Sequence, residues 1–322
     1  FHILRLIGRG AYGKVFLVQH KLSGQYYAMK AIHKAFVTED TRNIELTRAE
    51  RTILEDVQHP FIVRLFYAFQ TDHRLYLILE YIPGGELFHH LYHECMFPER
   101  VARFFIAEVV CALEHLHTLG IIYRDLKPEN CLIDREGHLV LTDFGLSKLG
   151  LPSNGKTSTF CGTTEYMAPE ILNEQPYDQA VDWWSLGILL FDMITGSPPF
   201  TGDNKNSVMN AIRRAQLKFP RYVSPAARQL VQALLHKDPA KRLGTFTGPI
   251  TTHRARRPMP SGGGGLGRRH SRIRQHKFFD GLDWAAVEAR TVKSPIIPKI
   301  RGDDDTSNFS TEFTSQPIAE SP

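Results

Sequence analysis

The feature that most constrains the fold is a change of hydrophobic pattern at Pro83-Gly84-Gly85. Before it, short segments rich in Ile, Val, Leu, Phe and Tyr alternate with turn residues, as the strands of a sheet do. After it, apolar residues recur at the three- and four-residue spacings of amphipathic helices. The chain has 322 residues, more than one hydrophobic core usually serves. The pattern therefore predicts an α+β protein with a small sheet lobe followed by a larger helical lobe.

The two predicted lobes differ in their elements. The first, at residues 1–82, is expected to hold a mostly antiparallel sheet with one main helix. The second, at residues 83–290, is expected to be mainly helical, and Gly120 ends its clearest helix. The predicted strands cover 1–7, 14–20, 26–32, 61–69 and 74–81, and the predicted helices cover 44–57, 98–118, 180–194 and 223–236.

Two stretches lie outside these patterns. Residues 245–276 contain a run of four glycines, three prolines and seven arginines, but no acidic residue. Because such a composition does not sustain a helix or strand, and because the stretch exceeds ordinary loops in length, we predict a disordered insertion. Residues 291–322 have little periodicity and only scattered aromatics, Phe309 and Phe313. They are expected either to lie as a tail on the folded body or to form a disordered end.

The charge balance argues against some classes of function. The chain has 39 Lys and Arg against 34 Asp and Glu, a formal charge of +5, which becomes −2 without the seven arginines of residues 245–276. A nucleic-acid-binding protein is therefore disfavoured, although a contact of this basic stretch with nucleic acid or acidic lipid stays open as an alternative. No apolar run reaches the roughly 18 residues that cross a bilayer, and the first residues lack a signal-peptide pattern. We expect neither a secreted nor a membrane-spanning protein.

The four cysteines indicate a cellular compartment. Cys95, Cys111, Cys131 and Cys161 form no Cys-x-x-Cys pair and lie in otherwise well-patterned segments. Reduced thiols fit this arrangement best. We therefore expect a cytoplasmic location, with the nucleus as a second compartment.

Three glycines follow the first predicted strand, in the pattern Gly8-x-Gly10-x-x-Gly13-x-Val15. Glycines at this spacing let the backbone of a hairpin approach phosphate groups closely. Taken alone, the pattern is equally compatible with a hairpin that binds nothing. A dinucleotide-binding fingerprint would continue into a helix after the third glycine, whereas residues 14–18 have a strand pattern. A Rossmann-type site is therefore not expected.

Lys30 lies inside the third predicted strand, directly after Ala28 and Met29. A buried cation needs an anionic partner, and Glu50 in the following helix is the candidate. Such an ion pair would orient Lys30 toward the phosphate oxygens of a nucleotide. The alternative is a surface lysine on an exposed face of the sheet.

The strongest signal is the segment Tyr123-Arg124-Asp125-Leu126-Lys127-Pro128-Glu129-Asn130, followed by Asp143-Phe144-Gly145 and Ala168-Pro169-Glu170. Phosphoryl transfer needs a group that orients the attacking hydroxyl, a cation near the transferred phosphoryl group and oxygen ligands for Mg²⁺. These types are supplied in order by Asp125, Lys127, Asn130 and Asp143. A chance coincidence of all three motifs at workable spacings is negligible.

At these motifs the sequence resembles the eukaryotic protein kinases, over nearly the whole chain apart from the insertion. The resemblance implies the bilobal kinase fold, protein substrates, and ATP and Mg²⁺ as cofactors. It implies that Asp125 positions the substrate hydroxyl and that Lys30, paired with Glu50, holds the α and β phosphates. Asn130 and Asp143 would hold Mg²⁺. The implied nucleotide site comprises Gly8, Gly10, Gly13, Val15, Ala28, Lys30, Glu80, Ile82, Glu86, Leu132 and Thr142.

Within this family the sequence resembles most the AGC group, and more narrowly the ribosomal protein S6 kinases of the 70-kDa type. Lys127 is typical of serine/threonine kinases, and Thr163 would support it by bonding to Asp125 and Lys127. The alternatives are another AGC kinase, similar to Akt or SGK, or a pseudokinase that binds nucleotide without turnover. The likeness rests on Tyr123 before the Arg-Asp pair, on Phe160-Cys161-Gly162-Thr163, on the tail, and on residues 59–63, 67–71, 75–81 and 309–314.

The resemblance also implies how the kinase is controlled and what it acts on. Thr159 occupies the activation-loop position that an upstream kinase would phosphorylate, and Ser321 would begin a second phosphosite in the tail. Glu86 and Glu129 match acidic positions that grip basic side chains of substrates. The S6 kinase type would act in growth and nutrient signalling.

Several positions depart from the family pattern. Leu46 stands where AGC kinases commonly have a histidine that reaches the activation-loop phosphate. Asn210 stands where an acidic residue helps to recognise basic substrates, and the insertion replaces a much shorter loop. The tail stops before the family's hydrophobic phosphorylation motif. We therefore expect a catalytic fragment of a longer protein.

Overall fold

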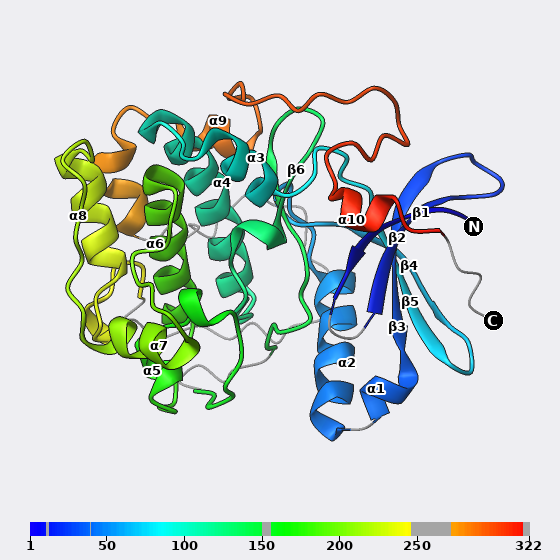
Figure 1. Cartoon of the computed structure of the whole chain (residues 1–322), viewed down its shortest axis with the longest axis horizontal. Helices are drawn as coiled ribbons and strands as arrows, with labels where there is room; N and C mark the ends of the chain where they lie inside the picture. Colours follow the sequence, from blue (N-terminus) through cyan, green and yellow to red (C-terminus); the bar gives the residue numbers. More distant parts are fainter. Residues whose placement is uncertain (11–12, 39, 150–155, 246–271, 318–322) are drawn as a thin grey trace, which may run out of the picture.

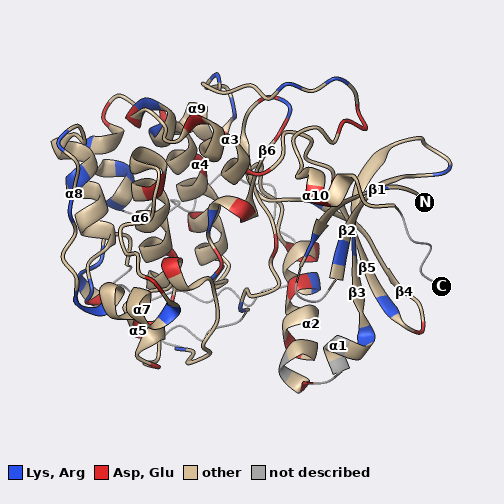
Figure 2. Cartoon of the chain, viewed as in Figure 1, with Lys and Arg blue, Asp and Glu red and all other residues tan. Residues whose placement is uncertain are grey.

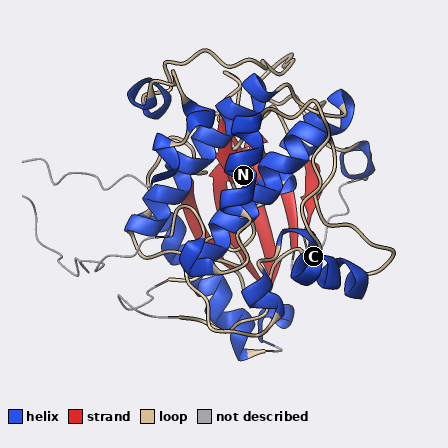
Figure 3. Cartoon of the chain, turned by 90° about the vertical axis from the view of Figure 1, so that its left-hand side faces the viewer, coloured by secondary structure: helices blue, strands red, loops and turns tan. Residues whose placement is uncertain are grey.

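A computed structural model describes residues 1–10, 13–38, 40–149, 156–245 and 272–317. Figure 1 shows a sheet with its accompanying helices at one end of the molecule and a larger group of helices at the other. Figure 3, turned by 90°, shows the helices of the large lobe in front of the strands. The predicted α+β fold with a small sheet lobe and a larger helical lobe is confirmed.

The small lobe contains a five-stranded antiparallel sheet with the order β1-β2-β3-β5-β4. Four strands agree with the prediction within two residues, but the fourth begins at Leu65 and not at residue 61. Residues 61–63 instead pair with a strand of the large lobe, since Val63 N donates to Leu141 O at 2.9 Å. The strands are β1 (His2–Arg9), β2 (Gly13–Gln19), β3 (Tyr26–His33), β4 (Leu65–Gln70) and β5 (Arg74–Glu80).

Two helices accompany this sheet. The long one, α2 (Thr41–Asp56), begins three residues before its predicted start and buries Ile53 and Leu54 against the core. The short one, α1 (Lys34–Thr38), was not predicted, because five residues are too few to show a helical period. Figure 1 shows α2 at the edge of the small lobe that faces the large lobe.

The large lobe is built around α4 (Glu99–Thr118) and α6 (Ala180–Thr195), both of which were predicted. All of α6 from Ala180 to Ile194 is buried, as expected for a helix that is apolar on every side. None of the described helices has the length and apolar character needed to cross a membrane. The other elements are α3 (Leu87–Glu94), β6 (Cys131–Ile133), β7 (Leu139–Leu141), α5 (Pro169–Leu172), α7 (Lys205–Arg214), α8 (Pro225–Leu234) and α9 (Trp284–Glu288), with 3-10 helices η1 (Pro128–Asn130), η2 (Thr164–Tyr166), η3 (Pro239–Lys241), η4 (Arg272–Gln275) and η5 (Lys277–Phe279).

The described part of the tail lies on the folded body, which was one of the two predicted alternatives. The Tyr81 hydroxyl donates to the carbonyl of Asp305 at 2.5 Å, and its ring stacks on Phe309 at a centroid distance of 5.8 Å. Asn308 Nδ2 donates to the carbonyl of Pro83 at 3.1 Å. The described part of the tail contains α10 (Thr311–Thr314), which packs against β1. The tail therefore contacts the segment that joins the two lobes.

The prediction of disorder over residues 245–276 is wrong at its C-terminal end. Arg274 forms ion pairs with Glu114 (2.6 Å) and Glu288 (2.7 Å), and Ile273 is fully buried. Paired and buried groups fix this part of the chain, which composition alone did not reveal. A Cβ atom added to Gly244 would lie 2.8 Å from Ile273 Cδ1, so the two flanks of the insertion meet. Residues 246–271 lie outside the described part of the chain.

Candidate active site

The predicted ion pair between Lys30 and Glu50 is present, and a third charge joins it. Lys30 Nζ on β3 lies 2.7 Å from Glu50 Oε1 on α2 and 2.8 Å from Asp143 Oδ1. Burial alone would lower the pKa of Lys30, but the two carboxylates outweigh it and raise that pKa above its ordinary value. Lys30 conversely holds the pKa of Asp143 below its usual range. The group therefore keeps one ammonium ion close to Asp143 at neutral pH, at the junction of the lobes.

The segment that follows α4 gathers the other predicted catalytic residues. Lys127 Nζ lies 3.1 Å from Asp125 Oδ2 and donates to Thr163 Oγ1 at 3.1 Å. Thr163 Oγ1 donates to Asp125 Oδ1 at 3.3 Å. Asn130 Nδ2 donates to Asp125 Oδ2 at 2.7 Å and to the carbonyl of Asp125 at 2.8 Å. Asp125 is 8% exposed, so one carboxylate is held by three side chains at the surface of the large lobe.

A buried carboxylate that the sequence reasoning missed accepts hydrogen bonds from the backbone of this segment. Asp182 on α6 accepts hydrogen bonds from the backbone N–H of Tyr123 (2.9 Å) and of Arg124 (2.8 Å), and His117 Nε2 lies 2.7 Å from it. Arg124 has a φ of +69°, which a residue with a side chain rarely adopts. Asp182 therefore holds a strained turn directly before Asp125. The signal was an acidic residue within the apolar pattern of 180–194.

The predicted nucleotide residues lie on strands of the small lobe, on the segment that joins the lobes and on or beside the short strands of the large lobe. A Cβ atom on Gly13 would lie 2.0 Å from the carbonyl oxygen of Ala31, whereas Gly10 has open space around it. Gly13 is thus required by the sheet, and Gly10 leaves room for a ligand. The remaining residues lie on β1 (Gly8), β2 (Val15), β3 (Ala28), the end of β5 (Glu80), the segment joining the lobes (Ile82, Glu86), β6 (Leu132) and directly after β7 (Thr142). Val15, Ala28 and Leu132 are half-buried.

The donor set fits a hard divalent cation. Asp143 Oδ1 accepts from Lys30 and from the N–H of Gly145 (3.2 Å), and the described structure shows no partner for its second oxygen. Asn130 donates through its amide nitrogen, so its amide oxygen stays available. A carboxylate and an amide oxygen are ligand types that Mg²⁺ accepts, with water and phosphate oxygens completing the shell. Asn130 and Asp143 could therefore hold Mg²⁺.

Acidic side chains gather beside the catalytic segment, and Figure 2 shows red positions where the lobes meet. Burial raises the pKa of Glu86 to about 7, with a further contribution from Glu129. Burial also raises the pKa of Asp192 on α6, to which Glu129 again contributes, and Tyr166 OH donates to Asp192 Oδ2 at 2.5 Å. Asp192 was missed by the sequence reasoning, although it too interrupts an apolar helix. Asn210, the predicted departure, lies exposed on α7.

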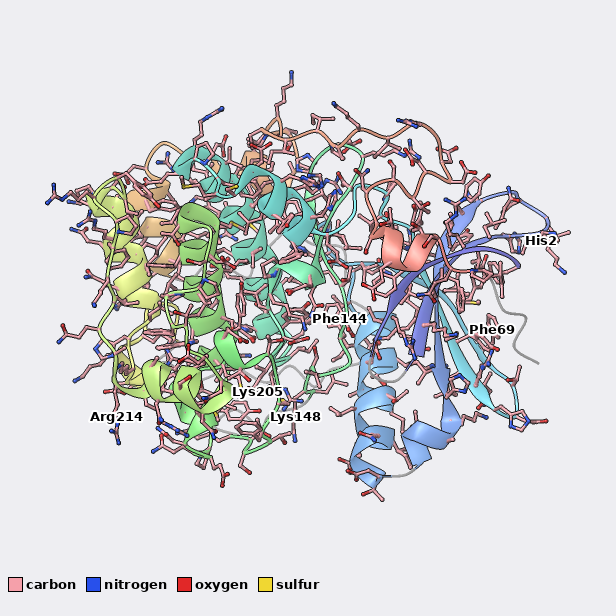
Figure 4. The ribbon with its side chains drawn as sticks, in the orientation of Figure 1. His2, Phe69, Phe144, Lys148, Lys205 and Arg214 are labelled. Atoms are coloured by element: carbon pink, nitrogen blue, oxygen red, sulfur yellow. The ribbon has the colours of Figure 1, made fainter. Side chains whose placement is uncertain are left out.

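The segment before Thr163 contacts Arg124. The Arg124 guanidinium donates to the carbonyl of Leu146 (2.6 Å) and to the hydroxyl of Tyr177 (3.1 Å). That hydroxyl donates to the carbonyl of Thr159 at 2.7 Å. Figure 4 labels Phe144 near the junction of the lobes and Lys148 below it. Leu46 is half-buried on α2, and the predicted phosphosite Ser321 lies outside the described residues.

Comparisons with known proteins agree with this geometry. The protein kinase domain family matches residues 1–253, and the protein kinase C terminal domain family matches residues 300–322. Ribosomal protein S6 kinase beta of Caenorhabditis elegans is 47% identical over all of this chain and 56% of its own length. Ribosomal protein S6 kinase alpha-1 of Homo sapiens is 46% identical over all of this chain and 41% of its own length. Ribosomal protein S6 kinase alpha-4 of Homo sapiens is 49% identical over 98% of this chain and 39% of its own length.

The chain thus spans about half the length of these relatives, or less. The family matches cover both lobes and the tail, and the motifs that carry the resemblance lie where the structure brings their side chains together. The chain belongs to the protein kinase family, and the relatives named above are ribosomal protein S6 kinases.

Proposed function

We propose that this chain is a serine/threonine kinase domain that transfers the γ-phosphoryl group of ATP to proteins with basic recognition motifs. The observation that carries the proposal is two neighbouring sets of side chains, with Lys127 of one set lowering the pKa of Asp143 in the other. Lys30 and Glu50 of the small lobe meet Asp143 of the large lobe, and Asp125 lies beside Asn130, the other metal-ligand candidate. No catalytic position of the family is replaced.

The chemistry assigned to each residue follows from its contacts. Asp125, held by Lys127, Thr163 and Asn130, would accept a hydrogen bond from the substrate hydroxyl and orient that oxygen toward the phosphorus. Lys127 would lie close enough to offset negative charge on the transferred group. Bound Mg²⁺ would neutralise charge on the phosphates. Lys30 would donate to the α and β phosphates, with Glu50 fixing its direction.

The acids beside the catalytic segment support the substrate preference. Glu86 and Glu129 offer two carboxylates that guanidinium groups of a substrate could contact. The exposed Asn210 would weaken selection at one position. We further propose that an upstream kinase phosphorylates Thr159, and that the protein acts in the cytoplasm and nucleus in S6 kinase-like growth and nutrient signalling.

A peptide array with ATP and Mg²⁺ tests the catalytic proposal. Protein first treated with an upstream kinase should phosphorylate Ser and Thr peptides, with higher rates when Arg precedes the acceptor. Asp125→Asn is the matched control, because it keeps the shape of the site but removes the carboxylate; it should bind nucleotide and lose turnover. Nucleotide binding by the unmutated protein without transfer to any peptide would favour the pseudokinase alternative.

A further inference from the structure

The Arg124 side chain is a buried cation whose partners are all neutral. The residue is 4% exposed, and its guanidinium donates to the carbonyl of Leu146 and to the hydroxyl of Tyr177. Among the described residues, no carboxylate pairs with Arg124. Burying a charge without an anionic partner costs free energy, so each neutral hydrogen-bond acceptor around the guanidinium helps to determine its position.

Tyr177, which contacts Arg124, is fixed by hydrogen bonds of both its backbone and its hydroxyl group. It is 2% exposed, and its backbone exchanges two hydrogen bonds with Thr157, at 2.9 and 2.8 Å. Its hydroxyl accepts from Arg124 at 3.1 Å and donates to the carbonyl of Thr159 at 2.7 Å. Burial raises the pKa of Tyr177 to about 12, so the hydroxyl keeps the proton that the second bond requires. One oxygen therefore connects the residue before Asp125 with the backbone of Thr159.

We propose that Tyr177 is a positioning residue that assembles the phosphate-binding pocket at Thr159 before any phosphate is present. It does so by holding the Arg124 guanidinium and the Thr159 backbone at a fixed separation. This inference rests on the proposed function, because it assumes that Thr159 is the activating phosphosite. A phosphate on Thr159 would give Arg124 an anionic acceptor and so make the Tyr177 hydroxyl less necessary. The hydroxyl should therefore matter most in the unphosphorylated protein.

Tyr177→Phe removes only the hydroxyl and tests this directly. In unphosphorylated protein, amides of residues 156–161 should exchange with deuterium about five- to tenfold faster, since two hydrogen bonds are lost. The kcat of this form should fall by a similar factor, with an unchanged KM for ATP. The form phosphorylated on Thr159 should stay within about twofold of the parent protein, so the activation ratio increases.

The control is Tyr27→Phe, which removes another buried tyrosine hydroxyl. Tyr27 is 5% exposed and donates to Gln25 Oε1 at 2.7 Å in the small lobe, so its loss should leave the activation ratio unchanged. A double-mutant cycle with Arg124→Lys adds a second test, because two changes at one contact should not add. Equal losses in both phosphorylation states, additive effects in the cycle, or unchanged exchange at residues 156–161 would each overturn the proposal. The exchange experiment needs no turnover, so it stands even if no peptide is phosphorylated and the proposed function fails.

Discussion

Asp182→Asn should destabilise the protein and slow catalysis through one buried contact. Asp182 is fully buried, and its two oxygens accept from the N–H groups of Tyr123 and Arg124, with His117 as a third partner. Asparagine has nearly the same size as aspartate but no charge. Its NH₂ group would replace one of the two acceptor oxygens and would therefore face an N–H donor. Hydrogen bonds to a charged acceptor contribute ~1.5–3 kcal/mol each, so losing one and weakening another should cost about 2–4 kcal/mol of unfolding free energy.

Urea unfolding followed by tryptophan fluorescence measures this cost, because Trp183 and Trp184 are the next residues of α6. Asp178→Asn is the control: the Asp178 carboxylate accepts one backbone N–H, from Ala180 at 2.9 Å, in a partly buried place. Because asparagine keeps an acceptor oxygen, this change should cost less than about 0.5 kcal/mol. The strained backbone of Arg124 should also relax in Asp182→Asn, so kcat should fall by more than the KM for ATP rises. A loss of stability below about 0.5 kcal/mol would refute the view that Asp182 holds this turn.

Three further predictions concern the site itself. Lys30→Met should lower kcat on the order of 100-fold by removing a positioned cation, while circular dichroism stays unchanged; near-normal turnover would remove Lys30 from phosphate binding. Because the pKa of Glu86 is about 7, that side chain gains its charge between pH 6 and 8, so the KM for an Arg-containing peptide should fall about two- to fivefold over that range. Glu86→Gln should flatten this dependence, and a parallel profile for both proteins would contradict it. Thr159→Ala should abolish activation by the upstream kinase, because no phosphate can then form at this position and pair with Arg124. Activation that persists in this variant would place the switch at another residue.

The fold could be predicted wherever apolar residues repeat over a long segment. The helices at 98–118 and 180–194 were found because their spacing persists over several turns. The fourth strand was placed too early because residues 61–63 are also extended and apolar, and the sequence does not show that they pair with β7. The ordered end of the insertion depends on ion pairs of Arg274 with Glu288 and with Glu114, which is 160 residues away in the sequence.

In the candidate site too, some residues could be predicted from the sequence and others could not. Asp125, Asn130 and Asp143 belong to short motifs, so they could be named from spacing. Asp182 and Asp192 lie inside an apolar helix, and only the fold shows that they face the catalytic segment and the acidic surface. A polar residue amid a buried pattern needs a partner, so such interruptions are a usable signal when the partner is unknown.

The contact between Gly244 and Ile273 brings the two flanks of the insertion together. Both flanks are fixed on the large lobe, through Ile273 in the core and Arg274 in its ion pairs. For a flexible loop closed between fixed ends, doubling the length costs only about 0.6 kcal/mol. Chains of this family can therefore differ in length between these two flanks with little thermodynamic penalty. A fluorescent domain whose own ends lie close together could be spliced in there and report on the kinase without entering its core.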